Sequence, residues 1–384
     1  MEQTTTDFIS GNKLPLILRL KLWNRYRLKK NRIKRLLKQD PTDRSYVPHP
    51  ETVSKLLFIE AQKGWGDFLY FLGLLNELHN YGVIIDVASL PTTYSRYKNI
   101  DFIRTVFSMS NENDIIEISK RSYDVAIDIT YVNDNGWEFR KPLLSMLTCH
   151  TMTTSDIASL SRLFDEFIDI SSKAHWQKRN ALILNKILNP HVEIDNIPPF
   201  YPVPQTSLVA DHFLSMFNKN KDLVYVNTVG GDKYRTLCQK QVEAIASIFN
   251  EKKQSIGIFF SNFPIKETDH VKRLSQMQFD DLTKVVQQCK AIISPDTSIV
   301  HLGSALKIPV LGFYCGNNRD YWPKHAMQDV WAPLAENSFI YVEDDPGVNT
   351  LADYIYTHRK KPISSYDPLV LKQTCIDFLN KLCL

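Results

Sequence analysis

The sequence predicts an α/β protein with two doubly wound parallel-sheet domains, preceded by a basic helical arm. The chain has 384 residues, which suits two domains of about 100 to 200 residues each. Short apolar strands alternate with helices of apolar periodicity in both halves, the pattern of parallel sheets covered by helices. Five prolines fall between residues 189 and 205 and indicate where the two halves connect.

The first half begins with a proline-bearing linker and then alternates strands and helices. We expect a strand at 55–61, a glycine loop, and an apolar helix closed by Gly82. Further strands are expected at 83–89 and 123–130, with a short helix and strand around 100–107. The order strand, loop, helix, strand is that of a parallel sheet.

The second half repeats this alternation without repeating the sequence itself. Strands are expected at 223–229, 255–261, 291–296 and 308–314, a loop and helix at 230–250, and further helices at 279–289, 297–307 and 370–384. We therefore divide the chain into an arm and linker (1–52), an N-terminal domain (53–200) and a C-terminal domain (201–384), whose last helix could pack back on the N-terminal domain.

Composition excludes several classes of protein. The chain is 43% hydrophobic and 23% charged, as in ordinary globular proteins. It has no run of about 18 apolar residues to span a membrane, and its N-terminus lacks the basic region of a secretory signal. The 6 cysteines form no CxxC pair and the 10 histidines no HExxH. We expect a cytoplasmic protein with reduced thiols and no metal.

The positive charge is concentrated in one segment. Residues 13–38 hold eleven of the 46 Lys and Arg and no acid, so the rest of the chain carries 35 bases against 42 acids. On a helix, one broad face of this segment collects Leu18, Leu22, Trp23, Tyr26, Ile33, Leu36 and Leu37. Such a helix suits the anionic inner leaflet of a membrane or packs on its own domain, and the two interpretations are equally supported. No nucleic-acid motif accompanies the basic run.

Two loops that follow predicted strands carry candidate chemistry, because ligands of open α/β sheets bind beyond the carboxyl ends of strands. The first is Gly64-Trp65-Gly66-Asp67, where the glycines permit close approach of a substrate. Asp67 is a candidate general base. Its alternative role is a helix N-cap, which position alone favours by about two to one.

The second loop runs from Ser294 to Ser298. The amides of Thr297, Ser298 and Ile299 would open the next helix and face a diphosphate. Asp296 would bind sugar or ribose hydroxyls, and its alternative role is again a cap. His301, one turn into the helix, could equally be a core histidine.

A third region, 230–235, follows the first strand of the second half. Its glycines with Lys233 and Arg235 would meet the same diphosphate, although a solvated basic turn is a live alternative. GxxxxGK[ST] and GxGxxG are both absent, so the sequence supports neither a P-loop kinase nor a standard dinucleotide dehydrogenase.

Taken in order, these motifs resemble glycosyltransferase family 9, the bacterial heptosyltransferases. The most specific is SPDTSIVHLGSALKIPVLGFYCG at 294–316. The others are the strand–Gly-Asp–helix segment at 56–79, YDVAIDIT at 123–130, HWQKR at 175–179 and NTVGGDKYRTL at 227–237. The resemblance covers about residues 55 to 384. Ser298 stands where the family usually has Gly, and Cys315-Gly316-Asn317-Asn318 replaces its Gly-Pro-Thr.

The resemblance implies a GT-B fold, with two Rossmann-like domains facing a cleft, and an inverting, metal-independent transferase without a cofactor. The implied donor is ADP-heptose and the acceptor a lipopolysaccharide or related glycolipid. Asp67 would be the base, with Gly64, Trp65 and Gly66 on the acceptor side. Lys233, Arg235 and the helix-start amides would stabilise the leaving diphosphate, and Asp296 and His301 would orient the donor.

Three other functions remain open on the sequence. They are a transferase that uses another nucleotide sugar, a nucleotide-sugar epimerase, and a non-catalytic, membrane-associated sugar-binding protein. An epimerase would release an altered sugar without an acceptor, and a binding protein would not turn over the donor.

Overall fold

A computed structural model describes residues 45–61, 64–130, 137–154, 163–170, 175–188, 193–217, 220–231, 233–315, 331–342 and 362–384. The basic segment 13–38 lies outside the described residues. The chain divides into two compact units. The first contains the described residues within 1–62 and 83–169, and the second those within 63–82 and 170–384. The boundary at residue 200 stays a prediction.

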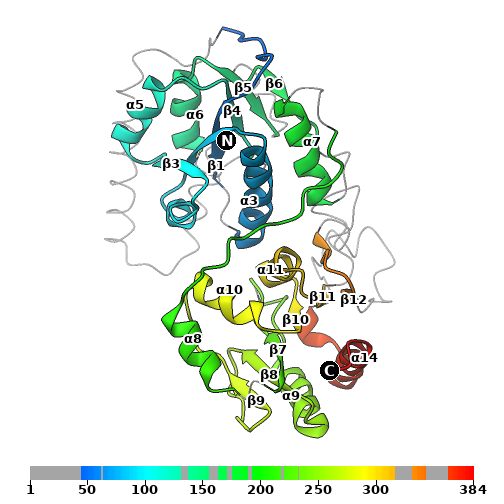
Figure 1. The fold of residues 1–384 in the computed structure, drawn as a ribbon. Coiled ribbons are helices and arrows are strands. Elements are labelled where there is room, and N and C mark those ends of the chain that lie inside the picture. The colour runs from blue at the N-terminus through cyan, green and yellow to red at the C-terminus, as the bar shows by residue number, and fades with distance from the viewer. Residues whose placement is uncertain are drawn as a thin grey trace, which may run out of the picture. The chain divides into compact units, whose positions relative to one another are not determined.

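The first unit is a parallel sheet of six strands in the order β3-β2-β1-β4-β5-β6 (Figure 1). Its strands are β1 (Lys55–Glu60), β2 (Ile84–Ser89), β3 (Ile103–Ser108), β4 (Val125–Asp128), β5 (His150–Thr153) and β6 (Glu166–Phe167). Helices α4 (Tyr94–Tyr97), α5 (Glu112–Lys120) and α6 (Trp137–Met146) connect them. The strand order changes direction between β1 and β4, because β2 and β3 lie on one side of β1 and β4 to β6 on the other. Such a point is the usual position of a ligand crevice in parallel sheets.

Apolar packing of α5 and α6 on one face of this sheet forms the core of the first unit. Leu57 and Ala126 of the strands lie in one buried cluster with Ile115 of α5 and Leu143 of α6. The unit also buries charge. Asp128, at the end of β4, pairs with Arg140 of α6, and both side chains are fully buried.

The second unit is a parallel sheet of six strands in the order β12-β11-β10-β7-β8-β9. Its strands are β7 (Asp222–Asn227), β8 (Ser255–Phe260), β9 (Val271–Arg273), β10 (Ala291–Pro295), β11 (Val310–Tyr314) and β12 (Phe339–Val342). Its helices are α3 (Trp65–Asn80), α7 (Trp176–Leu188), α8 (Leu208–Ser215), α9 (Gln239–Lys252), α10 (Phe279–Gln287), α11 (Ser298–Leu306) and α14 (Pro368–Lys381), with a 3₁₀ turn at Ile363–Ser365.

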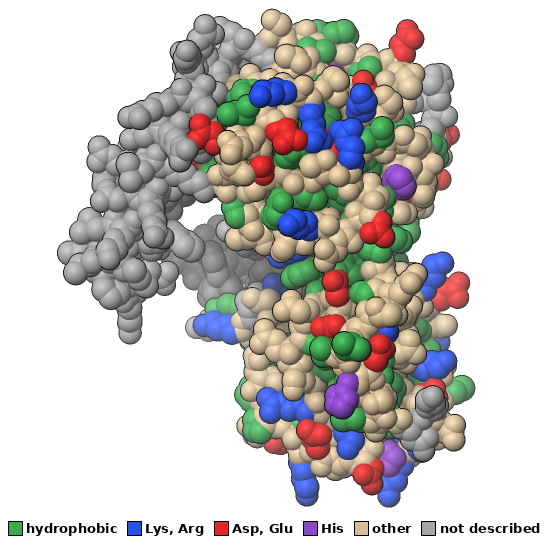
Figure 2. Space-filling model, turned by 60° about the vertical axis from the view of Figure 1, so that its left-hand side comes forward, with side chains coloured by type: hydrophobic (Ala, Val, Ile, Leu, Met, Phe, Trp, Pro, Cys, Tyr) green, Lys and Arg blue, Asp and Glu red, His purple; other side chains and the backbone are tan. Residues whose placement is uncertain are grey.

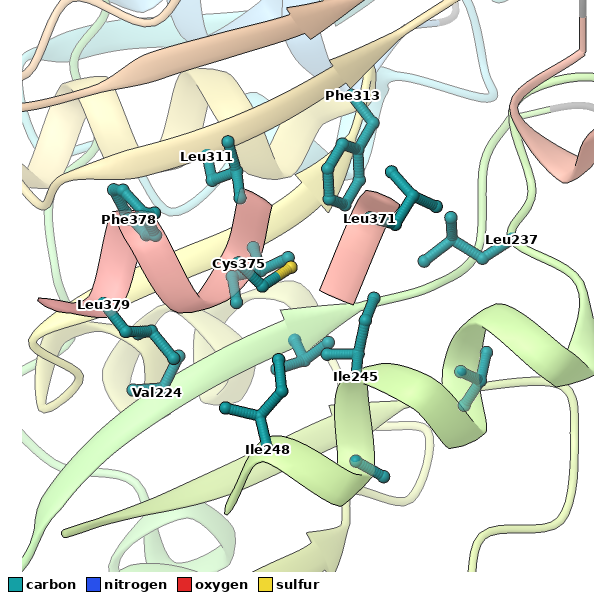
Figure 3. Close-up of a cluster of buried hydrophobic side chains, with 14 of the residues drawn as sticks. Val224, Leu237, Ile245, Ile248, Leu311, Phe313, Leu371, Cys375, Phe378 and Leu379 are labelled. Atoms are coloured by element: carbon teal, nitrogen blue, oxygen red, sulfur yellow. The ribbon is translucent and has the colours of Figure 1, made fainter. Parts of the chain in front are cut away.

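Helices cover both faces of the second sheet, because successive strand side chains point to opposite faces. Ile293 lies in the cluster that α9 and α14 cover, whereas the next residue back, Ile292, packs at Gly303 of α11. Figure 3 shows Leu371, Cys375, Phe378 and Leu379 of α14 in the cluster with Val224, Ile245 and Leu311. The last helix therefore packs in the second unit, against α9.

The predicted fold is confirmed in its main features: two doubly wound parallel sheets with helices between the strands. The described part of the chain contains no helix long and apolar enough to cross a membrane. Figure 2 shows one face of the molecule, on which positive and negative side chains are interspersed over both units.

Candidate active site

The first residues of α3 carry the candidate base. The N-cap of α3 is Gly64, and Asp67 is the third residue of the helix. Asp67 is therefore not the N-cap, and that alternative is wrong. Its carboxylate folds back over Gly64, where a Cβ would lie 2.3 Å from Asp67 Oδ2. The half-buried Asp67 thus lies in the first turn, where the helix dipole favours a negative charge.

The two residues before Asp67 pack against other helices of the second unit. The Trp65 indole stacks on Phe279, the first residue of α10, with ring centroids 4.0 Å apart. Gly66 lies against His301 of α11, and a Cβ on Gly66 would lie 2.7 Å from His301 Cδ2. Gly66 was expected to give room to a substrate, and in the structure it gives room to an imidazole. The substrate contacts of Gly64, Trp65 and Gly66 stay predictions.

His301 lies in a buried aromatic cluster. Its ring is 5.2 Å, centroid to centroid, from both Tyr70 of α3 and Trp331. Burial, assisted by the nearby His175, lowers the pKa of His301 to about 3, so the imidazole is neutral at physiological pH. Its Nδ1 has no hydrogen-bond partner among the described residues. The core role named in the sequence analysis fits this burial, and a donor contact stays a prediction.

The N-terminus of α11 has the form of an anion site. Thr297 is the N-cap, and its hydroxyl accepts from the Ile299 amide at 3.3 Å. Asp296 is therefore not the cap of this helix. The Ile299 amide is occupied by the cap, whereas the amides of Thr297 and Ser298 have no acceptor among the residues that the structure describes. These two amides and the helix dipole suit a phosphate.

Two buried polar residues, Asn227 and Ser294, hold this cap in place, and this role was not predicted for either. Asn227, the last residue of β7, donates from Nδ2 to the hydroxyls of Ser294 and Thr297 at 3.1 and 3.2 Å. Both Asn227 and Ser294 are buried. A polar residue that ends a buried strand beside a glycine loop is the signal that could have identified Asn227.

The glycine loop after β7 wraps around Arg235. Arg235 Nη1 donates to the Asp296 carbonyl oxygen at 3.1 Å and lies 3.6 Å from Asp296 Oδ2. A Cβ on Gly230 would lie 2.6 Å from Arg235, and one on Gly231 would lie 2.7 Å from Arg235 Nη2. The glycines thus make room for the arginine, and the loop is fixed to the start of α11 instead of forming a freely solvated turn.

Lys233 presents its charge on the surface of the same loop. Its side chain is exposed, and its ammonium lies 5.2 Å from the centroid of the half-exposed Tyr234 ring. Lys233 is therefore a solvent-accessible cation two residues before Arg235, which pairs with Asp296. It could contact a phosphate without first breaking a buried ion pair.

Helix α7 supplies the basic segment at 175–179, and it packs against α3. His175 Nε2 lies 3.1 Å from the Ala332 carbonyl oxygen, and burial is the largest cause that lowers the His175 pKa. The fully buried Arg179 guanidinium lies 5.3 Å from the Trp176 ring. His175, Trp176 and Arg179 are thus part of the packed interior of the second unit, whereas Lys178 is exposed.

The second unit brings most of the predicted site residues to two adjoining helix ends. A carboxylate stands in the first turn of α3, α3 packs on α11, and the first turn of α11 offers free amides with Lys233 and Arg235 in the loop beside them. Such an arrangement can accept a proton at one point and stabilise a diphosphate at another.

Comparison with known proteins gives concordant matches. Residues 251–344 match the model of glycosyltransferase family 9 (heptosyltransferase). The Escherichia coli (strain K12) protein named "Putative lipopolysaccharide heptosyltransferase 4" is 22% identical over 337 residues, which are 84% of this chain and 90% of that protein.

Solved structures share the fold. A glycosyl transferase family 9 protein from Veillonella parvula DSM 2008 has a TM-score of 0.67 at 11% identity and covers 88% of this chain and 100% of its own. E. coli ADP-heptose lps heptosyltransferase II gives 0.62 at 13% identity, with coverage of 86% and 100%. E. coli heptosyltransferase WaaC with ADP-2-deoxy-2-fluoro heptose gives 0.57 at 14%, with coverage of 84% and 99%.

The family match and the heptosyltransferase relatives indicate a glycosyltransferase. They also confirm the resemblance found in the sequence: this chain is similar to glycosyltransferase family 9 and has a GT-B-like fold.

Proposed function

We propose that this protein transfers heptose from ADP-heptose, with inversion, to a lipopolysaccharide or related glycolipid. The observation that carries the proposal is the packing of α3 on α11, which joins the turn that bears Asp67 to the helix end that offers free amides. The names of the relatives support the donor, since two of the similar structures are an ADP-heptose transferase and a complex with an ADP-heptose analogue.

In the proposed reaction, the acceptor hydroxyl attacks the anomeric carbon and its proton passes to the Asp67 carboxylate. The bond from that carbon to the diphosphate oxygen breaks, and ADP leaves with the electron pair. Lys233 and the amides of Thr297 and Ser298 stabilise the charge on the leaving diphosphate. Since these groups supply the positive charge, the scheme includes neither a metal ion nor a cofactor. Asp296 and Arg235 hold the donor loop, and Asp296 is also proposed to orient the donor sugar or ribose.

The test is a panel of nucleotide sugars, ADP-heptose among them, incubated with purified protein with and without lipopolysaccharide acceptors, in EDTA and in Mg²⁺. We expect transfer from ADP-heptose only when an acceptor is present, at equal rates in both buffers. Conversion of the free sugar without an acceptor would identify an epimerase. Binding without turnover would identify a sugar-binding protein, and transfer only from another donor would correct the sugar.

Asp67→Asn connects the activity to the site. Loss of the base should lower kcat about 100-fold or more, whereas Glu77→Gln, which removes a carboxylate three turns further along α3, should leave kcat near that of the wild type. Equal activity of Asp67→Asn and Glu77→Gln would remove Asp67 from the mechanism.

The basic segment 13–38 extends the proposal to location. We propose that the enzyme is cytoplasmic and binds the inner leaflet, where a lipid-anchored acceptor would lie. Each basic residue near an anionic surface contributes about 1 kcal/mol, so eleven suffice for reversible attachment. Replacing all eleven Lys and Arg of this segment by Gln in the full chain should abolish binding to anionic vesicles but not activity on a short soluble acceptor. If the variant instead loses heat stability and the wild type ignores vesicles at low salt, the segment packs on the protein.

A further inference from the structure

The contact between Gly66 and His301 fixes how closely α3 and α11 approach. With no side chain at position 66, His301 comes within the space of a Cβ: the missing atom would lie 2.7 Å from Cδ2 and 3.2 Å from Nε2. Real Cβ atoms essentially never come within 3.0 Å of such a neighbour, so any side chain at position 66 must displace something.

The imidazole is not free to move aside. The side chain is buried, and its ring packs on both Tyr70 and Trp331, each 5.2 Å away between centroids, which are themselves 5.8 Å apart. Turning it would disturb a cluster that also contains the Trp176 ring, 5.5 Å from Trp331. Rotation out of a packed position costs free energy in a close-packed interior.

Neither helix can readily retreat from the contact. On the side of α11 away from α3, Gly303 packs on the sheet so closely that a Cβ there would lie 2.3 Å from Val310 Cγ2 and 2.9 Å from Ile292 Cδ1. On α3, Phe71 lies on a different face of the helix from Gly66 and packs on Trp176 of α7, with ring centroids 5.7 Å apart. Helix α11 is thus held against the sheet, and α3 against α7.

We propose that Gly66 is a positioning residue, and that His301 is the spacer that sets the distance between the Asp67 carboxylate and the amides at the start of α11. Asp67 follows Gly66 directly, and His301 lies one turn beyond Thr297. A displacement at the contact therefore shifts the proton acceptor relative to the leaving group. This inference rests on the proposed function, in which those two groups act on one reaction.

A cycle of Gly66→Ala, His301→Ala and the double variant tests the spacing. In the wild-type background, Gly66→Ala should lower kcat about 10- to 100-fold, the usual scale for misplacement by about 1 Å. Donor KM should change by less than about threefold, because the anion site on α11 and its loop is intact. In the His301→Ala background the space is already open, so adding Gly66→Ala should cost less than about threefold in kcat.

Gly73→Ala is the matched control. It crowds the same helix seven residues further along, where His301 is not the neighbour, so His301→Ala should not relieve its effect. If the contact were merely structural, Gly66→Ala would lower the melting temperature without lowering kcat selectively while donor KM stays nearly unchanged.

Several results would overturn the inference while leaving the proposed function intact: an active wild type with an equally active Gly66→Ala variant, kcat losses that multiply across the cycle, or a loss confined to donor KM. If Gly66→Ala does not fold, His301→Ala is compared with the double variant. A kcat of the double variant that is lower by about tenfold or more would contradict the inference. A wild type that transfers no sugar would sink the proposed function and this inference with it.

Discussion

Arg235 joins the loop after β7 to the start of α11 through Asp296. Its Nη1 donates to the Asp296 carbonyl oxygen at 3.1 Å and lies 3.6 Å from the Asp296 carboxylate. Asp296 in turn donates its amide to the Phe313 carbonyl oxygen at 2.8 Å, which extends the pairing of β10 and β11 by one residue. The loop that carries Lys233 and the helix end with free amides are therefore held as one piece.

Arg235 and Asp296 should act together on nucleotide binding. Arg235→Ala and Asp296→Ala should each weaken ADP binding, and the double variant should be little worse than either one, with a coupling of about 1 kcal/mol. Calorimetric titration with ADP measures this coupling. Arg273→Ala, at the exposed end of β9, is the control and should bind as the wild type does. Fully additive losses would show that the two residues contact ADP independently.

Lys233 should contribute affinity as a charge. A hydrogen bond to a charged group is worth about 1.5 to 3 kcal/mol, so Lys233→Ala should weaken ADP binding about tenfold or more. The difference should shrink as salt is raised, because the exposed cation is screened. Lys290→Ala removes an exposed cation just before the first residue of β10, at the opposite end of that strand from Asp296. An equal loss in both variants would indicate general charge attraction instead of a site.

Acid should destabilise the fold through its buried histidines. Burial lowers the pKa of His301 to about 3 and also lowers the pKa of His175. Below about pH 6.5 the two rings therefore bind protons more readily in the unfolded chain than in the native state. The contribution of His301 to stability is then fully present above about pH 6.5 and falls as the pH drops toward 3, by up to about 1.4 kcal/mol per unit, and His175 acts in the same direction.

His301→Phe keeps a ring in the pocket and removes the titration, so the free energy of unfolding should fall less steeply between pH 6.5 and 4. Urea denaturation at each pH measures the slope, and His212→Gln on the exposed surface of α8 is the control. An unchanged slope in His301→Phe would assign the acid sensitivity to other groups.

Removing one partner of the buried Asp128–Arg140 pair should destabilise the first unit strongly, whereas replacing both partners should destabilise it only slightly. Arg140→Ala leaves the Asp128 carboxylate buried without its cation, which should cost about 3 to 5 kcal/mol. Replacing both residues by Met and Leu should cost much less, since neither charge is then left buried. Urea denaturation of the two proteins decides, and a double variant as unstable as Arg140→Ala would contradict this account.

Strand positions were the most predictable part of the fold. Runs such as LLFI in β1 and AIIS in β10 are buried on both faces, so nearly every residue is apolar. Helices α5, α6 and α8 and strands β5, β6, β9 and β12 were not predicted. The strand β5 reads HTMT, and its burial of His150 and two threonines depends on partners elsewhere in the chain.

The site was predictable in its residue types but not in their pairings. Sequence position suggested that Asp67 and Asp296 could cap helices, yet Gly64 and Thr297 occupy those positions. The glycines at 66, 230 and 231 suggested room for a ligand, and the structure fills that room with His301 and Arg235. His301 is distant in sequence from Gly66, and Arg235 comes from the opposite end of the loop that holds Gly230 and Gly231. No local sequence pattern therefore encodes these contacts.

The placement of α3 has a consequence for building chimaeric enzymes. This helix lies in sequence between β1 and β2 of the first sheet, yet it packs with α7 and α11 of the second unit. A hybrid joined at a single point between the two sheets would pair the α3 of one parent with the α11 of the other, and so a glycine of one with the histidine of the other. A functional exchange would need three junctions, near residues 63, 82 and 170, so that each α3 travels with the helices on which it rests.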